Sequence, residues 1–293
     1  MAIDARFPVL ITGCSSGIGR ALARTCAAEG WRVYATARDV TAIADLADAR
    51  ITVLSLDVTD EASMQRVVRH ALDSHGGIAA LVNNAGYALP GAVEDLHIDA
   101  LRAQFETNVF GAIRLVQLVV PSMRAAGAGQ IVNMSSMGGT LTFPGGGAYH
   151  ASKYALEALS DALRFELSGF GIDVLVIQPG LVRTGFGRAA HDRLAAAQLE
   201  GPNGAFNRAV ALSNVAAYED PASGAGTAEE VARFVCGVMQ HPRPRARYRV
   251  LKSAHTFMNL RRRLSDRAWD ELMGNFYPRP GAAPGPSGRG TGR

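Results

Sequence analysis

Short apolar runs rich in β-branched residues alternate with longer segments of helical periodicity along most of this chain. Such alternation is typical of βαβ units, in which a helix joins each buried strand to the next parallel one. We therefore predict an α/β fold with a doubly wound, mostly parallel sheet of seven strands and helices on both of its faces. The predicted strands are residues 9–12, 32–36, 52–56, 78–82, 130–134, 173–177 and 248–251. The clearest predicted helices are residues 18–29, 63–74, 101–125 and 148–168.

The chain has 293 residues, of which 48% are hydrophobic, enough for one α/β domain with additions. We expect this single domain to cover residues 1–277. A long insertion after the sixth strand, residues 181–226, carries scattered apolar residues between glycines and is predicted to be a substrate lid. Residues 252–277 are a predicted C-terminal helical extension. Residues 278–293 consist mostly of Pro, Gly, Ala, Ser and Arg, which bury too little apolar surface to fold, so we predict a disordered tail.

The start of the chain and its cysteines indicate the compartment. The first residues lack the basic region, long apolar stretch and cleavage site of a signal peptide, and no uninterrupted apolar run approaches the roughly 18 residues of a membrane span. The three cysteines, Cys14, Cys26 and Cys236, have no metal-ligand spacing, so no metal site is predicted. We expect a soluble protein of the reducing cytoplasm.

The formal net charge of +4 is concentrated in one segment, residues 241–263, which holds seven arginines, one lysine and no acid. A solvated surface is the simplest interpretation of this segment. Contact with an anionic lipid, with an acidic ligand or with another subunit remains an alternative. Nucleic acid is not an expected partner, because no recognition motif accompanies the charge.

A glycine-rich turn follows the first predicted strand and opens the first predicted helix. Glycines let the chain turn tightly and approach a phosphate, and the free N–H groups and positive dipole of the helix attract its charge. The position therefore predicts a site for the pyrophosphate of a dinucleotide, whereas a purely structural turn is the alternative. The residues concerned are Gly13, Ser15, Ser16, Gly17, Ile18 and Gly19.

The second predicted strand ends in Ala37-Arg38-Asp39, about 20 residues past the glycines. At this position an acid binds the 2′-hydroxyl of NAD(H), whereas an arginine accommodates the 2′-phosphate of NADP(H). Arg38 is the first charged group available, so we predict a preference for NADP(H). NAD(H) is the alternative if Arg38 only caps a surface turn and Asp39 starts the next helix.

Tyr149 and Lys153 are four residues apart in a predicted helix and therefore lie on one face of it. A fixed cation beside a phenol favours the phenolate and lowers the pKa of the phenol, which would make tyrosine an acid/base catalyst. Taken alone, this spacing also occurs by chance on solvated helix faces. The interpretation depends on the other motifs of the chain.

From about residue 8 to residue 250, the chain resembles the single-domain branch of the short-chain dehydrogenase/reductase family, which implies a Rossmann-type sheet. The motifs follow predicted strand ends, where ligands bind in open α/β sheets. They occur in the family's order: Thr12-Gly13-x-x-x-Gly17-Ile18-Gly19, Asp57-Val58, Asn83-Asn84-Ala85-Gly86, Ser135-Ser136, Tyr149-x-x-x-Lys153, and Pro179-Gly180 with Thr184.

The resemblance implies roles for four catalytic residues. Tyr149 would exchange a proton with the substrate oxygen while hydride moves to or from the nicotinamide, and Lys153 would hold the nicotinamide ribose and lower the pKa of Tyr149. Ser136 would donate a hydrogen bond to the substrate oxygen; a strand-end cap is the alternative for this serine. Asn108 would kink its helix and support a water-linked proton path to Lys153; a buried structural amide is the alternative. His150 points away from Tyr149 around the helix and is given no role.

The resemblance also implies cofactor contacts along the strand ends. Asp57 and Val58 would contact the adenine. Asn83, Asn84, Ala85 and Gly86 would pass beneath the adenine ribose, although the two asparagines could instead link neighbouring strands. The nicotinamide would be flanked by Pro179, Gly180, Val182 and Thr184.

The segments expected to face the nicotinamide are residues 87–89, residues 138–147 with Leu141 and Phe143, and the lid. They are apolar and nearly free of acids, which favours a hydrophobic ketone or secondary alcohol. Within the family, the chain looks like the 17β-hydroxysteroid and retinol dehydrogenases and like the acyl-dihydroxyacetone-phosphate reductases, which suggests a steroid-, retinoid- or lipid-like substrate. A sugar epimerase and a catalytically silent dinucleotide sensor are the alternatives.

A homodimer or homotetramer is expected from the habit of the family and from an apolar stripe in the C-terminal extension. The same stripe could belong to a core helix of a monomer. Its residues are Phe257, Leu260, Leu264 and Leu272.

Overall fold

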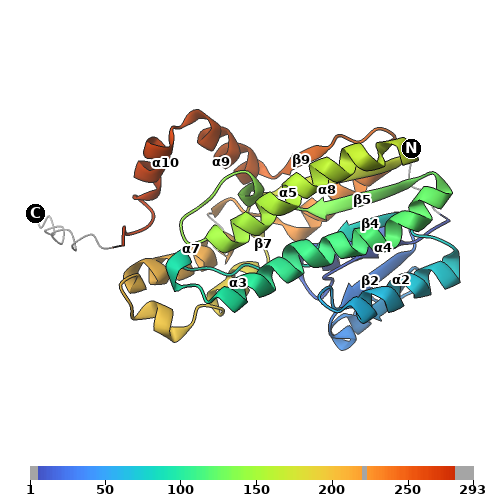
Figure 1. Cartoon of the computed structure of the whole chain (residues 1–293), viewed down its shortest axis with the longest axis horizontal. Coiled ribbons are helices and arrows are strands. Elements are labelled where there is room, and N and C mark those ends of the chain that lie inside the picture. The colour runs from blue at the N-terminus through green and yellow to red at the C-terminus, as the bar shows by residue number, and fades with distance from the viewer. Residues whose placement is uncertain (1–5, 220–222, 281–293) are drawn as a thin grey trace, which may run out of the picture.

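Seven parallel strands form the central sheet, in the order β3-β2-β1-β4-β5-β6-β9 (Figure 1). The structure is a computed structural model that describes residues 6–219 and 223–280. The predicted α/β, doubly wound, Rossmann-type architecture is confirmed, and each predicted strand lies within two residues of its observed bounds. The strands are β1 (Val9–Ile11), β2 (Val33–Ala37), β3 (Ile51–Ser55), β4 (Ala80–Asn83), β5 (Gly129–Met134), β6 (Ile172–Pro179) and β9 (Arg247–Val250).

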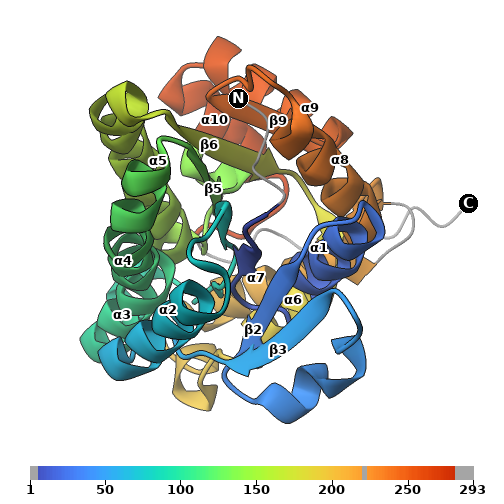
Figure 2. The same cartoon turned by 90° about the vertical axis from the view of Figure 1, so that its right-hand side faces the viewer.

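Strand β1 is apolar throughout because its two faces are covered by different helices. In β1, Val9 and Ile11 pack on one face while Leu10 packs on the other, as expected from the two-residue repeat of a strand. Figure 2 shows α1 and α8 on one side of the sheet and α2, α4 and α5 on the opposite side. The bounds are α1 (Gly17–Ala28), α8 (Ala228–Gln240), α2 (Glu61–His75), α4 (Gly111–Ala126) and α5 (Gly147–Leu167).

The helix predicted over residues 101–125 is divided into three parts. α3 (Ile98–Phe105) leads into a π-helical turn, Glu106–Phe110, and then into α4. π-helical turns occur mostly as short insertions at functional sites, and this one contains Asn108. The whole helical run 98–126 is long and apolar enough to cross a membrane by length and composition alone. Within the protein, 44% of its most apolar window is buried, and α4 packs on the sheet. The cytoplasmic location stays a prediction.

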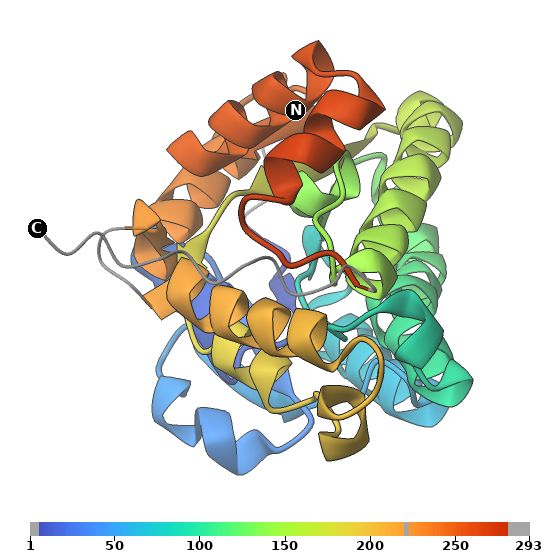
Figure 3. The same ribbon diagram turned by 90° about the vertical axis from the view of Figure 1, so that its left-hand side faces the viewer.

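The predicted lid contains two helices and a short 3₁₀ turn. These are α6 (Phe186–His191), η6 (Ala196–Leu199) and α7 (Gly204–Glu219), which Figure 3 shows in yellow and orange. Two short strands, β7 (Val182–Arg183) and β8 (Gly226–Thr227), pair in parallel and join the two ends of the lid. The lid therefore begins and ends at one place beside the sheet.

The C-terminal extension packs on the loop that follows β5. It consists of α9 (Lys252–Arg263) and α10 (Asp266–Met273), and Trp269 of α10 donates a hydrogen bond from Nε1 to the Thr142 carbonyl oxygen at 3.1 Å. Beyond α10, the Tyr277 hydroxyl lies 3.2 Å from Ser213 Oγ on α7. The extension thus connects the loop after β5 with the lid. Residues 281–293, which are most of the predicted disordered tail, lie outside the described residues.

The apolar stripe of the C-terminal extension mostly faces the interior. Phe257, Leu264 and Leu272 pack against a small core that also contains Met137 and Leu141. This arrangement matches the alternative of a core helix in a monomer and removes one reason for expecting an oligomer. The homodimer or homotetramer stays a prediction.

Replacement of Trp269 tests this small core, to which Trp269 belongs. Trp269→Ala removes a buried indole and is expected to lower the free energy of unfolding by about 3–5 kcal/mol. Trp269→Phe keeps a ring but loses the hydrogen bond to Thr142, at a cost of about 1 kcal/mol. Phe276→Ala is the control, because Phe276 is 62% exposed. Urea denaturation measures all three, and an Ala variant as stable as the Phe276 control would contradict the packing.

Candidate active site

A cavity of about 830 Å³ lies at the carboxyl ends of the central strands, where an open α/β sheet binds its ligands. Among the predicted site residues, Gly19, Asn83 and Asn108 do not line it. The predicted residues that do line it are Gly13, Ser15, Ser16, Gly17, Ile18, Arg38, Asp57, Val58, Asn84, Ala85, Gly86, Ser136, Tyr149, Lys153, Pro179, Gly180, Val182 and Thr184.

The glycine-rich turn opens the N-terminus of α1 toward the cavity. Gly13 and Gly17 have φ angles of +72° and +56°, which side chains other than glycine rarely adopt. Ser16 precedes the helix without capping it by its side chain, and the first turn contains no acid. The free N–H groups and the positive dipole of α1 therefore suit a pyrophosphate.

Gly19 acts on the other side of this turn. A Cβ atom at Gly19 would lie 2.4 Å from both Asn84 Nδ2 and the Gly13 carbonyl oxygen. Glycine is thus required at this position so that α1 can pack against the turn and the end of β4. Its contribution to the cavity is indirect.

Two polar residues join the turn after β1 to the end of β4. Thr12 Oγ1 accepts hydrogen bonds from the backbone N–H groups of Asn84 and Ala85, at 3.0 and 2.9 Å. In return, Asn84 Nδ2 donates to the carbonyl oxygens of Thr12 and Gly13, at 2.8 and 3.1 Å. We call this set the Thr12–Asn84 junction. Thr12 was expected only as part of a motif, and its bonds could not be deduced from the spacing.

Asn83 has a similar structural role one residue earlier. Its Nδ2 donates to Asn133 Oδ1 at 2.9 Å and to the Ala112 carbonyl oxygen at 3.2 Å. Asn133 is on β5 and Ala112 is on α4. The alternative that the two asparagines link neighbouring strands is therefore correct for their side chains, while Asn84 also lines the cavity.

The end of β2 presents an arginine and an aspartate with different surroundings. The Asp39 carboxylate accepts hydrogen bonds from Thr41 N and Thr41 Oγ1, at 2.9 and 2.6 Å, and caps the 3₁₀ helix η1 (Val40–Leu46). Arg38 lines the cavity, and no carboxylate pairs with its guanidinium among the described residues. Arg38 therefore supplies, at the end of β2, a positive charge that no acid neutralises among the described residues.

Tyr149, Lys153 and Ser136 meet at the centre of the cavity. The Lys153 ammonium nitrogen lies 5.7 Å from the centroid of the Tyr149 ring and donates to the Met134 carbonyl oxygen at 2.8 Å. Ser136 lies close enough to the Tyr149 phenol to lower its pKa. Ser136 also accepts a bond from Gly138 N at 3.0 Å, so it caps the strand end as well. Ser135 Oγ is buried without a partner among the described residues, which favours Ser136 as the active serine.

The pKa values of this pair differ from the expected ones. Burial raises the pKa of the Tyr149 phenol to about 12, and the Ser136 hydrogen bond opposes the increase. Burial lowers the pKa of the Lys153 ammonium to about 8, and the charge of Glu157 opposes the decrease. The expectation that Lys153 lowers the pKa of Tyr149 is therefore not met by the residues of the chain alone. Removal of the phenol from water raises its pKa more than its neighbours lower it.

Asn108 supports the site from behind. Its Nδ2 donates to the Tyr87 carbonyl oxygen and to Ser152 Oγ, at 2.9 and 3.0 Å, and its Oδ1 accepts from Tyr87 N at 3.1 Å. Ser152 in turn donates to the Tyr149 carbonyl oxygen at 2.7 Å. These bonds are those of a buried structural amide. A Cβ atom on Gly86 would lie 3.1 Å from Asn108 Oδ1 and 3.6 Å from Lys153 Nζ, so glycine keeps the space between them open.

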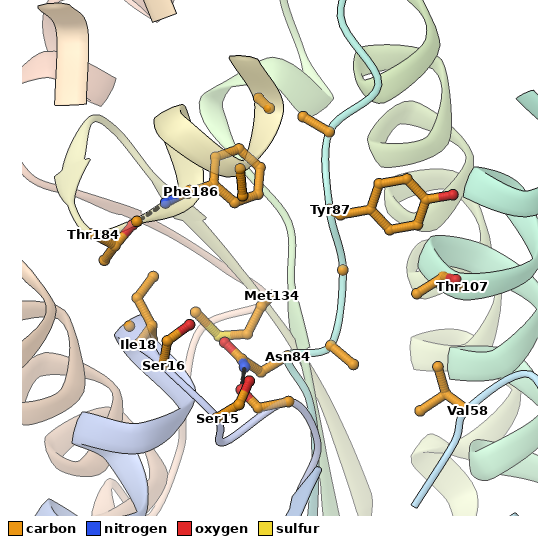
Figure 4. Close-up of a pocket in the computed structure, with 18 of the residues that line it drawn as sticks. Ser15, Ser16, Ile18, Val58, Asn84, Tyr87, Thr107, Met134, Thr184 and Phe186 are labelled. Atoms are coloured by element: carbon orange, nitrogen blue, oxygen red, sulfur yellow. Dashed lines mark hydrogen bonds between the residues drawn. The ribbon is translucent and has the colours of Figure 1, made fainter. Parts of the chain in front are cut away.

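The predicted lid contributes two aromatic residues to the wall of the cavity. The Phe186 ring lies 5.5 Å from the Tyr149 ring and 5.7 Å from the Tyr218 ring, and both Phe186 and Tyr218 line the cavity. Figure 4 shows Phe186 and Thr184 on one side of the cavity and Tyr87 with Thr107 and Val58 on the other. In the same view, Ser15 and Ser16 of the glycine-rich turn lie below Phe186 and Thr184.

Residues 138–147 were expected to face the nicotinamide but do not line the cavity, and neither does Leu89, so that prediction was wrong for them. Leu141 and Phe143 do not line the cavity and pack instead against the C-terminal helices. The Phe143 ring contacts the rings of Phe257 and Trp269 at 5.3 and 5.8 Å. Burial lowers the pKa of His150 to about 4. Its ring lies 5.7 Å from the Tyr149 ring and 6.0 Å from the Phe143 ring, so it does not point away from Tyr149 as expected, but it does not line the cavity.

Known proteins share both the sequence and the fold of this chain. Residues 8–195 match the family described as short chain dehydrogenase. The chain belongs to this family. A 17-beta-hydroxysteroid dehydrogenase type 1 of Mus musculus is 36% identical over 258 residues, which cover 82% of this chain and 72% of that protein. A 3-ketodihydrosphingosine reductase of Bacteroides thetaiotaomicron is 38% identical over 178 residues, covering 61% of this chain and 65% of the reductase, just under two thirds of its length.

Solved structures of short-chain dehydrogenases have the same fold. One from Streptomyces avermitilis is 34% identical, with a TM-score of 0.75, and the match covers 93% of this chain and 98% of that one. Another, from Burkholderia phymatum in complex with NAD, is 25% identical, with a TM-score of 0.77, and the match covers 97% of this chain and 99% of that one. The likeness thus extends beyond the sheet to nearly the whole chain.

The Thr12–Asn84 junction can be tested in this short-chain dehydrogenase by Thr12→Val. Valine has nearly the shape of threonine but leaves two N–H groups without an acceptor, so the free energy of unfolding should fall by about 2–4 kcal/mol. Thr12→Ser keeps the hydroxyl and is expected to stay within about 1 kcal/mol of the wild type. Urea denaturation distinguishes them, and equal stability of the Val and Ser variants would contradict the role of the junction.

Proposed function

We propose that this protein is an NADP(H)-dependent oxidoreductase that transfers a hydride between the nicotinamide and a hydrophobic ketone or secondary alcohol. The observation that carries the proposal is the presence of the Tyr149 phenol, the Ser136 hydroxyl and the Lys153 ammonium in one cavity, with the ammonium nitrogen 5.7 Å from the centroid of the phenol ring. The open N-terminus of α1 at the same cavity suits the phosphates of a dinucleotide. Acid/base group, hydrogen-bond donor and phosphate site thus share one space.

The chemistry of the proton can be assigned to these residues. A bound nicotinamide dinucleotide would donate or accept the hydride. Ser136 would donate a hydrogen bond to the substrate oxygen, and Tyr149 would give its proton to that oxygen during reduction or take one during oxidation. Because burial raises the pKa of Tyr149 to about 12, the phenol is protonated at neutral pH and is ready to act as the acid. Lys153 would hold the nicotinamide ribose through N–H groups that Met134 leaves free.

The charges at the end of β2 support NADP(H) over NAD(H). Oδ1 of the Asp39 carboxylate already accepts two hydrogen bonds from Thr41, which reduces its capacity to accept from a ribose 2′-hydroxyl. The Arg38 guanidinium at the same cavity is not paired with an acid in the described part of the chain. A 2′-phosphate would give this arginine a partner.

The walls of the cavity support a steroid-, retinoid- or lipid-like substrate. Around Tyr149 they include the aromatic rings of Phe186 and Tyr218, and Met134 also lines the cavity. Such walls favour apolar substrates with one polar group placed at the reacting centre. Two relatives are named for a hydroxysteroid and for a sphingoid ketone, which agrees with this class.

Tyr149→Phe tests the mechanism. NADPH oxidation with a panel of hydrophobic ketones is expected to fall by about 10²–10⁴-fold, because the variant lacks the transferable proton. The affinity for NADPH, followed by fluorescence titration, should stay nearly unchanged. Tyr154→Phe is the matched control, since Tyr154 lies on the same helix, is exposed and does not line the cavity.

Unchanged turnover in Tyr149→Phe would contradict the assignment of the acid. Tight binding of NADPH by the wild type without turnover of any ketone or alcohol would favour a dinucleotide sensor instead. Inversion of a stereocentre in a sugar nucleotide, with the cofactor left in its original oxidation state, would favour an epimerase.

A further inference from the structure

Arg193 is a lid residue with an exposed positive charge at the cavity. It lies in the turn that follows α6 and lines the cavity. Its guanidinium carbon lies 4.2 Å from the centroid of the Tyr87 ring, close enough for a cation–π interaction. Over residues 6–219 and 223–280, no carboxylate forms an ion pair with Arg193. The ring thus holds the arginine in place without neutralising it.

Arg38 brings a second cation to the same region from the end of β2. Burial raises the pKa of the Tyr87 phenol, and the positive charges of Arg193 and Arg38 oppose this increase. Both guanidiniums therefore act on one phenol, although they come from segments about 150 residues apart in the sequence. Glu106 also lines the cavity, but neither arginine forms an ion pair with it. Two unpaired cations around one opening suit a phosphate, which can accept charge-assisted bonds from both.

The position of Tyr87 identifies which end of the cavity this is. Figure 4 shows the Tyr87 ring directed toward the side of the cavity where Thr107 and Val58 lie, opposite Phe186 and Thr184. Phe186 is the residue in contact with the Tyr149 ring. Arg193, which contacts Tyr87, therefore lies on the side of the cavity where Thr107 and Val58 lie. The Tyr149 phenol, which would meet the substrate, lies on the side of Phe186.

We propose that Arg193 determines cofactor specificity from the lid, by binding the 2′-phosphate of NADP(H) opposite Arg38. This inference rests on the proposed use of NADP(H). It adds a function for the lid, because Arg193 and Phe186 belong to one short segment that includes α6. When Arg193 engages the phosphate, the same segment holds Phe186 over Tyr149. The lid therefore closes more firmly on NADP(H) than on NAD(H).

Calorimetric titration of full-length variants with NADP⁺ and NAD⁺ tests this inference. Arg193→Gln removes one charge-assisted contact and is expected to weaken NADP⁺ binding about tenfold while NAD⁺ binding changes less than about twofold. Arg183→Gln is the matched control: it removes the same charge from the lid, but Arg183 is exposed on β7 and does not line the cavity. It should leave both affinities unchanged.

A second pair of variants tests the role of the ring. Tyr87→Phe keeps the aromatic surface beneath Arg193 and should retain the preference for NADP⁺. Tyr87→Leu removes that surface, and the preference should fall about threefold, as expected for loss of an exposed cation–π interaction. Loss of preference in both Tyr87 variants would overturn the stacking role.

Fragments of the cofactor distinguish the phosphate from an acidic group on the substrate. 2′-Phospho-ADP-ribose contains neither nicotinamide nor substrate, and Arg193→Gln should weaken its binding about tenfold, with ADP-ribose unaffected. An unchanged affinity for 2′-phospho-ADP-ribose, together with a higher KM for the ketone, would overturn the inference and assign Arg193 to the substrate. Equal weakening for both fragments would also overturn it.

If the wild type itself binds NAD⁺ and NADP⁺ equally well, the proposed preference for NADP(H) fails. If the wild type prefers NADP⁺ and this preference survives Arg193→Gln, only the role of Arg193 is rejected.

Discussion

The hydrogen bonds between Thr12 and Asn84 determine the position of most groups around the cavity. They join the turn after β1 to the end of β4, two neighbouring central strands of the sheet. Because Asn84 also holds the Gly13 carbonyl oxygen, the start of α1 cannot shift relative to β4. Gly19 lets the helix approach this junction closely. The N–H groups of α1 therefore point to a fixed place, as binding of a phosphate requires.

A second constraint comes from α5, which carries the acid and the cation on one face. Asn108 bonds to Ser152 between these two residues and to the backbone of Tyr87, so the π-helical turn, α5 and the loop after β4 are held together. One turn further along α5, the buried Glu157 carboxylate is paired with Arg247 of β9 and bonded to Gln178 of β6. The helix is thus attached at both ends of its active segment, which fixes the Tyr149 phenol against Ser136. Burial then raises the pKa of the Tyr149 phenol and lowers the pKa of the Lys153 ammonium.

The sequence predicted the strands closely because β-branched runs are the strongest local signal in an α/β chain. It also selected Ser136 over Ser135 from the family interval, and Ser136 is the serine that influences the pKa of Tyr149. The features it missed depend on contacts between distant segments. Leu141 and Phe143 were expected at the nicotinamide because they follow a strand end, but the C-terminal helices cover them. The division of the helix at Glu106 and the approach of Arg193 to Tyr87 leave no periodic trace in the sequence either.

The central claim is that the Thr12–Asn84 junction and the start of α1 form a dinucleotide site. Backbone hydrogen exchange of the wild type, measured with and without saturating NADP⁺, tests it most directly. The account predicts slower exchange in residues 13–20 and 84–88, with little change in α2, which lies away from the cavity. Unchanged exchange at the glycine-rich turn, with protection elsewhere, would contradict the account.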